Sequence, residues 1–145
     1  MDFITLVNDW KTFLFCLNKS TPHWFERDPE FAWGFFGHRL MLYKSTLPHA
    51  GFNILKKLCH QKDNYFIYTS NVDGHFQKAG FHEDHIVECH GALSHMQNLQ
   101  GTGQLWPCPD DFTVNFDSNT FRAAQPLPRG PPGIMKVQFS FVHGN

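Results

Sequence analysis

The order of patterns between residues 48 and 89 constrains the fold of this chain more than any other feature. Apolar side chains recur at helical spacing in residues 48–58, which predicts an amphipathic helix. Two runs rich in β-branched and aromatic residues follow at 64–70 and 85–89, and such runs are typical of buried strands. Between them, residues 77–80 predict one helical turn closed by glycine. Helices that alternate with strands in this order predict a parallel sheet with crossovers, and therefore an α/β fold.

Two flanking regions extend this unit. On the N-terminal side, residues 1–20 carry an aromatic face at helical spacing, and the sequence DPE at 28–30 predicts the start of a second helix. On the C-terminal side, residues 92–133 are rich in Gly, Pro, Asn and Asp, which predicts a small irregular excursion with a hairpin. Residues 134–142 then predict a third strand that returns to the parallel sheet.

Composition and charge exclude several classes of protein. Hydrophobic residues make up 41% of the 145 residues and include sixteen Phe, so a wholly disordered chain is excluded. The formal net charge of −1 gives no strong field to recruit nucleic acid or an anionic membrane. No stretch approaches the roughly 18 apolar residues of a membrane span. The four cysteines form no CxxC pair, and with no recognisable export signal we expect free thiols and a cytoplasmic or nuclear location.

The segment from residue 69 to residue 95 holds five of the ten histidines, and a metal site is one interpretation of it. His82, His85, Cys89 and His90 are donors of the kind that bind zinc. His85 and Cys89 would lie at opposite ends of a strand, however, so they cannot both reach one small ion. We therefore predict no metal site here, and a metalloprotein is a distant alternative.

A ligand site at the carboxyl ends of the two strands is a second interpretation of the same segment. Ser70, Asn71 and Asp73 follow the first strand directly, and His90 follows the second. Ligands of open α/β sheets bind beyond the carboxyl ends of strands, and a histidine there can act as a base near neutral pH. Polar residues after a strand also form turns by bonding their own backbone, and the residues alone leave both interpretations open.

The run TSNVDGHFQKAG, followed by IVECHG, resembles the sirtuin pattern Thr-Gln-Asn-(Ile/Val)-Asp-Gly, then Ala-Gly, a strand and His-Gly. Sequence upstream of it is similar to bacterial-type members, so the resemblance covers roughly residues 24–142. Sirtuins are NAD-dependent protein-lysine deacylases with a Rossmann-like large domain and a small zinc-ribbon module. The resemblance therefore implies one incomplete domain over 1–145. Its parts would be a partial Rossmann-like parallel sheet with helices (24–91), a degenerate small module (92–133) and a returning strand (134–145).

The resemblance also implies roles for single residues. Asn71 and Asp73, with Ser70 beside them, would line the pocket for the nicotinamide and ribose of NAD. His90 would be the general base that activates a ribose hydroxyl, and the acyl group of an acyl-lysine protein substrate would pass to ADP-ribose as nicotinamide leaves. The other histidines of the segment have no place in the pattern and are expected at the surface: His75, His82, His85 and His95.

The chain departs from the sirtuin pattern in three respects. Ser70 stands where the family usually has Gln. No glycine precedes Gly34, so the glycine loop that cradles the NAD phosphates has no counterpart, and later adenine-contacting segments are absent. We therefore expect a domain shortened at both ends. The four zinc-cysteine positions carry other residues, which predicts no structural zinc: Asn98, Gly101, Gly130 and Gly133.

These departures predict that the chain alone is weakly active or inactive, and they leave two further alternatives open. One is a non-catalytic module that binds a protein partner through exposed Phe and Trp side chains. The other is a nucleotide-binding pseudoenzyme that binds NAD or ADP-ribose without turnover. Binding of NAD separates the first alternative from the rest. Replacement of His90 tests the second, because binding without turnover does not need its imidazole.

Overall fold

The computed structural model describes residues 21–62, 64–100, 104–130 and 137–139. Its helices are α3 (Trp24–Arg27), α4 (Pro29–Ser45), α5 (Ala50–His60), α6 (His75–Lys78) and the 3₁₀ turn η1 (Glu83–His85). Its strands are β1 (Ile67–Thr69), β2 (Ile86–Glu88), β3 (His95–Asn98), β4 (Leu105–Pro107) and β5 (Val137–Phe139). The helix predicted at residues 1–20 lies outside the described residues. Among the helices that are described, none combines the length and apolar character needed to cross a membrane.

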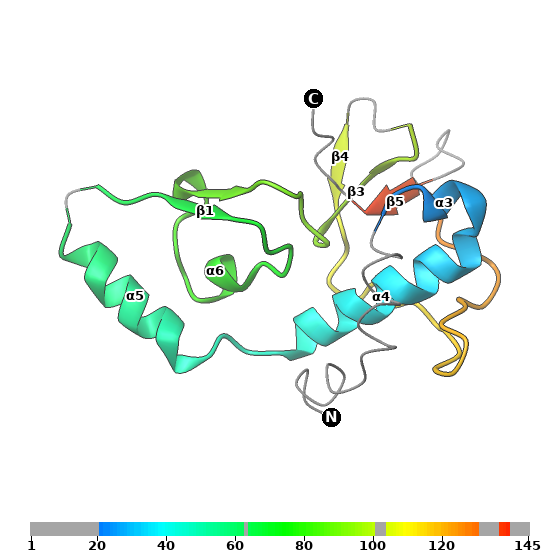
Figure 1. Cartoon of the computed structure of the whole chain (residues 1–145), viewed down its shortest axis with the longest axis horizontal. Coiled ribbons are helices and arrows are strands. Elements are labelled where there is room, and N and C mark those ends of the chain that lie inside the picture. Colours follow the sequence, from blue (N-terminus) through cyan, green and yellow to red (C-terminus); the bar gives the residue numbers. More distant parts are fainter. Residues whose placement is uncertain (1–20, 63, 101–103, 131–136, 140–145) are drawn as a thin grey trace.

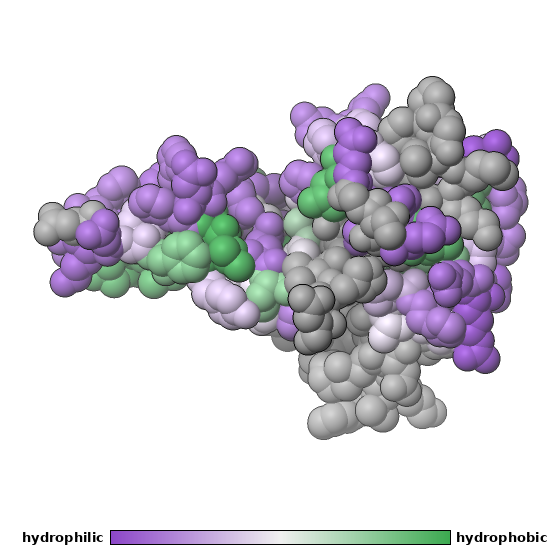
Figure 2. Space-filling model, turned by 90° about the horizontal axis from the view of Figure 1, so that it is seen from above, coloured by the Kyte–Doolittle hydropathy of each residue, from purple (hydrophilic) through white to green (hydrophobic). Residues whose placement is uncertain are grey.

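The elements form two lobes that are joined by the extended residues 46–49 and, farther along the chain, by residues 89–94 (Figure 1). We call the first the core lobe, which contains α3, α4, β3, β4, β5 and the loop 108–130. The second is the sheet lobe, which contains α5, β1, α6, η1 and β2. Seen from above in Figure 2, the sheet lobe extends as a narrow arm from the bulkier core lobe.

Helix α4 is the central element of the core lobe. Its start is set by Asp28, whose Oδ1 accepts a hydrogen bond from the N–H of Phe31 at 3.2 Å, while Pro29 occupies the first turn. The helix start that was predicted at 28–30 is therefore confirmed. Residues 31–37 are all buried, because α3, β3 and the loop 108–130 pack around this helix.

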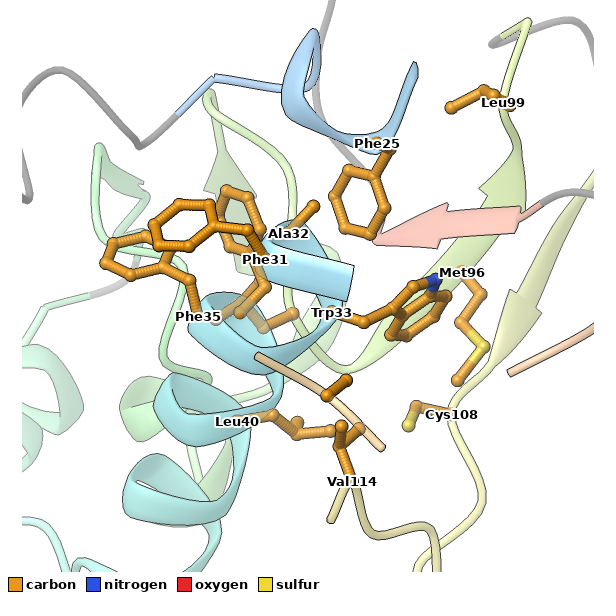
Figure 3. Close-up of a cluster of buried hydrophobic side chains, with 13 residues drawn as sticks. Phe25, Phe31, Ala32, Trp33, Phe35, Leu40, Met96, Leu99, Cys108 and Val114 are labelled. Atoms are coloured by element: carbon orange, nitrogen blue, oxygen red, sulfur yellow. The ribbon is translucent and has the colours of Figure 1, made fainter. Parts of the chain in front are cut away.

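Aromatic side chains fill the centre of this lobe (Figure 3). The ring of Phe25 meets Trp33 edge-on at 5.3 Å and stacks on Phe36 at 5.4 Å between centroids. In Figure 3, the indole of Trp33 points toward Met96 and Cys108. The buried Phe side chains of the described residues lie chiefly in this lobe, which agrees with the expectation that the apolar content of the sequence supplies a core.

One glycine of α4 permits the loop 108–130 to lie directly on the helix. A Cβ at Gly34 would lie 2.0 Å from the carbonyl oxygen of Phe121, a distance that no side chain tolerates. Close approach also lets the N–H of Ala123 donate to the carbonyl oxygen of Glu30 at 2.9 Å. The loop is thereby attached to the helix by backbone as well as by side chains.

The sheet lobe contains the parallel strand pair that the sequence predicted. Strands β1 and β2 pair in parallel, with Ile67 opposite Ile86, Tyr68 opposite Val87 and Thr69 opposite Glu88. The connection between them contains α6 and η1, and Gly80 closes the α6 turn with a φ of 81°. The predicted α/β class and the short glycine-closed turn are both confirmed.

The predicted hairpin of the excursion is present, but the third strand is not where it was predicted. Strands β3 and β4 pair antiparallel, and β5 pairs antiparallel with the other edge of β3. The prediction that residues 134–142 return to the parallel sheet is therefore wrong. An antiparallel neighbour needs only a loop to run back along β3, whereas a parallel third strand would need another crossover of about a dozen residues or more.

Candidate functional site

The carboxyl ends of β1 and β2 carry two loops that lie side by side. The N–H of Cys89 donates to the carbonyl oxygen of Thr69 at 2.9 Å, which extends the strand pairing by one residue. Farther on, the N–H of Leu93 donates to the carbonyl oxygen of Val72 at 3.2 Å. These two hydrogen bonds hold the loop 70–74 against the turn 89–92. The loop that carries Ser70, Asn71 and Asp73 is thus the neighbour of the turn that carries His90.

Within the loop 70–74, the backbone is shaped by local hydrogen bonds. The N–H of Asn71 donates to Oγ1 of Thr69 at 3.1 Å, and the N–H of His75 donates to Oδ1 of Asp73 at 3.0 Å. Gly74 has a φ of 67°, and a Cβ placed there would meet no atom within 4 Å. Asp73 is therefore a turn former, as the sequence allowed, and the space above Gly74 is open to a ligand.

The candidate side chains differ in exposure. Ser70, Asn71 and His90 are exposed, and Asp73 is half-buried beside the first turn of α6. One oxygen of Asp73 accepts from the backbone, and the other lies 3.8 Å from Nδ1 of His75. The amide of Asn71, the hydroxyl of Ser70 and the imidazole of His90 are therefore exposed to solvent at one edge of the sheet. The carboxylate of Asp73 is held by its hydrogen bond from the backbone.

Glu88 is a further residue of this site, and the sequence analysis missed it. Its Oε2 accepts a hydrogen bond from Nε2 of Gln77 at 3.1 Å, and its carboxylate also accepts from the backbone of Gly74. Burial raises the pKa of Glu88, the charge of Asp73 acts in the same direction, and the two hydrogen bonds oppose them. Glu88 therefore ties β2, two residues before His90, to the loop 70–74. An acid inside an otherwise apolar strand was the signal that could have identified it.

The histidines of the segment divide into two groups. His82 and His95 are exposed, as predicted. His75 and His85 are half-buried, so the prediction that they lie at the surface is wrong. The ring of His75 packs against Phe52 at 6.1 Å, that of His85 packs against Tyr65 at 4.4 Å, and each has one buried nitrogen without a hydrogen-bond partner in the described part of the chain. Their aromatic neighbours come from α5 and from the segment before β1, and strand pattern alone does not show this.

Helix α6, which follows the loop 70–74, is attached to the core lobe by one lysine. Nζ of Lys78 donates to the carbonyl oxygens of Tyr43, Lys44 and Thr46 at 2.5, 3.0 and 3.1 Å. These carbonyls belong to the end of α4, where a cation is favourable for the helix dipole. Lys78 thus couples the position of the candidate site to α4, which has more buried residues than any other described helix.

No group of three or more His, Cys, Asp or Glu side chains in the described ranges could hold a metal ion. Of the four positions aligned with zinc cysteines, Asn98 ends β3 and Gly130 lies in the loop 108–130. Gly101 and Gly133 lie outside the described residues. The absence of a structural zinc stays a prediction.

Comparison with known proteins identifies the family of this fold and site. The family model described as "Sir2 family" matches residues 16–106. The chain belongs to this family, the sirtuins, and the resemblance read from the sequence is confirmed.

Curated relatives share part of their length with this chain. An NAD-dependent protein deacylase of Aquifex aeolicus is 33% identical over 117 residues, which cover 81% of this chain and 42% of the relative. One from Thermus thermophilus is 28% identical over 107 residues, which cover 71% of this chain and 41% of the relative. The chain thus spans about two fifths of the length of these relatives.

Solved structures agree on the fold. A Sir2 homologue in complex with NAD superposes with a TM-score of 0.67 at 18% identity, covering 86% of this chain and 43% of that one. An ADP-ribose complex of a Sir2 homologue superposes with a TM-score of 0.65 at 18% identity, covering 84% and 44%. The partial Rossmann-like fold with helices is confirmed. The roles of Ser70, Asn71, Asp73 and His90 stay predictions.

Proposed function

We propose that this chain is the part of an NAD-dependent protein-lysine deacylase that receives the nicotinamide and ribose end of NAD and carries the general base. The observation that supports this most directly is the pairing of the loop 70–74 with the turn 89–92 at the carboxyl edge of a parallel sheet, in a chain of the Sir2 family. Curated relatives from two bacterial species are named as deacylases of this kind.

The residues present fit one half of the dinucleotide. Asn71 offers an amide that can both donate to and accept from a carboxamide, and Gly74 leaves open space beside it. Asp73 is held in place by the N–H of His75, so its carboxylate can orient a donor without first becoming ordered. The phosphate half of the dinucleotide has no matching glycine loop among residues 1–33, because no glycine occurs there.

The chemistry that we assign to this chain is proton transfer by its own side chains and the orientation of the bound cofactor. NAD supplies, when bound, a ribose carbon from which nicotinamide can leave. The imidazole of His90, which is exposed at the turn 89–92, would take a proton from a ribose hydroxyl of the bound cofactor. The contact of Glu88 with Gln77 at 3.1 Å holds α6, which follows the loop 70–74, against β2, which precedes His90. The acyl-lysine protein substrate would lie on the open side of the same edge.

Calorimetric titration with NAD tests this proposal, followed by nicotinamide release from an acetyl-lysine peptide. We expect Asn71→Ala to lose binding. We expect His90→Ala to retain binding and to lose turnover by about 10²–10⁴-fold, because the base contributes to chemistry and little to affinity. His95→Ala is the matched control, since His95 is an exposed histidine on β3 outside the site. Equal turnover in His90→Ala and His95→Ala would refute the assignment.

A nucleotide-binding protein without turnover is a second candidate. The observation that favours it is the presence of the nicotinamide half of the site in a sequence with no glycine before Gly34. Binding of ADP-ribose that His90→Ala leaves unchanged, together with no release of nicotinamide from wild type, would favour this candidate over the enzyme. A cytoplasmic or nuclear location stays a prediction.

A further inference from the structure

His75 faces both oxygens of the Asp73 carboxylate. Its backbone N–H donates to Oδ1 at 3.0 Å, and Nδ1 of its ring lies 3.8 Å from Oδ2. The second distance is too long for a hydrogen bond, so Oδ2 keeps its lone pairs for another donor while the imidazole is neutral. A protonated ring at the same position would place a cation beside this carboxylate, and the two opposite charges would attract each other. The charge of His75 therefore decides whether Oδ2 is available to a ligand.

The ring of His75 is enclosed between two helices. Its side chain is 14% exposed, and the rings of Tyr43 from α4 and Phe52 from α5 meet it edge-on at 6.5 and 6.1 Å between centroids. Figure 1 shows α6, which begins at His75, between α5 and the end of α4. Nε2 is buried and has no hydrogen-bond partner in the described part of the chain. Protonation would give the ring a charge that only Asp73 is placed to pair with, among the residues that the structure describes.

Charged and titratable groups stand near this pair on every element packed against it. On α4, Nε and Nη2 of Arg39 donate to the hydroxyl of Tyr43 at 3.0 and 2.7 Å. On β2, the charge of Glu88 acts on Asp73. The remaining two are an exposed lysine of α6, which bonds the end of α4, and an exposed histidine before α5, which packs on Phe52: Lys78 and His49. Within this set, His75 is the histidine whose ring faces Asp73, and histidine is the side chain that changes charge near neutral pH.

We propose that His75 makes the candidate site sensitive to pH. The neutral imidazole leaves Asp73 free to accept a hydrogen bond from the nicotinamide or ribose end of NAD, whereas the imidazolium takes Asp73 as its own partner. This inference rests on the proposed function of the loop 70–74. The nicotinamide ring of NAD carries a positive charge, so an imidazolium here also repels the ligand. Both effects have the same sign, and NAD binds less tightly as the pH falls through the range in which histidine gains a proton.

Calorimetric titration of the full chain with NAD, at several values between about pH 5 and pH 8, tests the inference. We expect the affinity of wild type to fall by about tenfold toward the acid end, because a hydrogen bond to a charged group is lost. His75→Leu removes the titrating ring together with its unpartnered nitrogen, so it should fold at least as well as wild type and bind NAD equally across the range.

His82→Leu is the matched control. Nδ1 of His82 lies 3.5 Å from Oδ2 of Asp84 in an exposed pair outside the site, so this variant should keep the pH dependence of wild type. His90→Ala should keep it too, which separates His75 from the proposed general base. An affinity that does not change with pH in wild type, or that changes equally in His75→Leu, would overturn the inference. A pH dependence that His90→Ala removes would overturn it as well.

A second measurement needs no ligand, so it decides the matter even if the chain binds no NAD. The nuclear magnetic resonance signal of the Asp73 carboxyl carbon is followed over the same pH range. In wild type we expect it to move together with the ring signals of His75, and in His75→Leu we expect this movement to be lost. Equal movement in both proteins, or none in wild type, would overturn the inference. Coupled signals in a chain that binds no NAD at any pH would refute the proposed function and leave the coupling of His75 with Asp73 in place.

Discussion

The two lobes of this molecule differ in how their apolar side chains are used. The core lobe contains a cluster of buried aromatic and aliphatic side chains, in which Phe36 is 1% exposed. In the sheet lobe, α5 and α6 contain no buried residue, and Phe81 is the buried aromatic, at 5% exposed. The loops that carry the candidate site belong to the less packed lobe. Stability and function are thus assigned to different parts of the chain.

This separation is physically reasonable for a ligand site. Segments with few buried contacts open at a lower free-energy cost than the global unfolding of the protein. A site in such a segment is adjustable, but it depends on neighbours to hold its geometry. Here those neighbours are Lys78, which reaches the end of α4, and Glu88, which reaches Gln77 of α6.

The largest expected effect comes from removing a ring of the core lobe. Trp33 is 2% exposed and contacts Phe25 at 5.3 Å, so Trp33→Ala should lower the free energy of unfolding by about 3–5 kcal/mol. Phe66→Ala is the matched change in the sheet lobe. Because Phe66 is 63% exposed, its replacement should change the free energy by no more than about 0.5 kcal/mol.

Urea unfolding of the two variants measures this difference. Comparable destabilisation by Phe66→Ala and Trp33→Ala would show that the side chain of Phe66 is packed in solution. The contrast between the two lobes would then be wrong.

The sequence predicts local features of both lobes more reliably than contacts between distant segments. Asp28 and Pro29 predict the start of α4, because a helix cap depends on residues within one turn. The parallel pairing of β1 with β2 follows from the order of the elements. The partner of β5 was predicted wrongly, because both sheets offer an edge and a short strand pattern does not select between them.

For the candidate site, too, the sequence predicts which residues follow the strands but not which distant residues they contact. The ends of β1 and β2 locate Ser70, Asn71, Asp73 and His90, because strand ends follow from pattern. The burial of His75 was not predictable, since it depends on Phe52 from α5. Glu88 was missed because its partner Gln77 is reached through the fold of the crossover.

The connection between the lobes gives a prediction of intermediate size. Lys78→Met removes three hydrogen bonds to the end of α4, and since Lys78 is exposed, we expect a loss of about 1 kcal/mol. Hydrogen exchange should quicken in α6 and the loop 70–74 more than in α4. Lys57→Met, at an exposed lysine of α5, is the control and should leave exchange unchanged. Uniform quickening across α4 and α6 would contradict a local attachment.

The smallest expected effect is a pH dependence with opposite sign in the two lobes. Burial raises the pKa of Glu88 in the sheet lobe, so the folded chain keeps this proton to a higher pH than the unfolded chain does. In the core lobe, hydrogen bonds from the N–H and the hydroxyl of Thr120 and from the N–H of Asn119 lower the pKa of Asp117. The folded chain therefore releases this proton at a lower pH than the unfolded chain does.

The signs follow from these shifts. Relative to Glu88→Gln, wild type should lose stability as the pH rises through the window just above the ordinary range of a carboxyl group. Relative to Asp117→Asn, it should lose stability as the pH falls through the window just below that range. Urea unfolding at a series of pH values measures both differences. If the Glu88 difference did not change with pH, Glu88 would be ionised as readily in the folded chain as in the unfolded chain. Its contact with Gln77 would then be a surface hydrogen bond that does not fix α6 against β2.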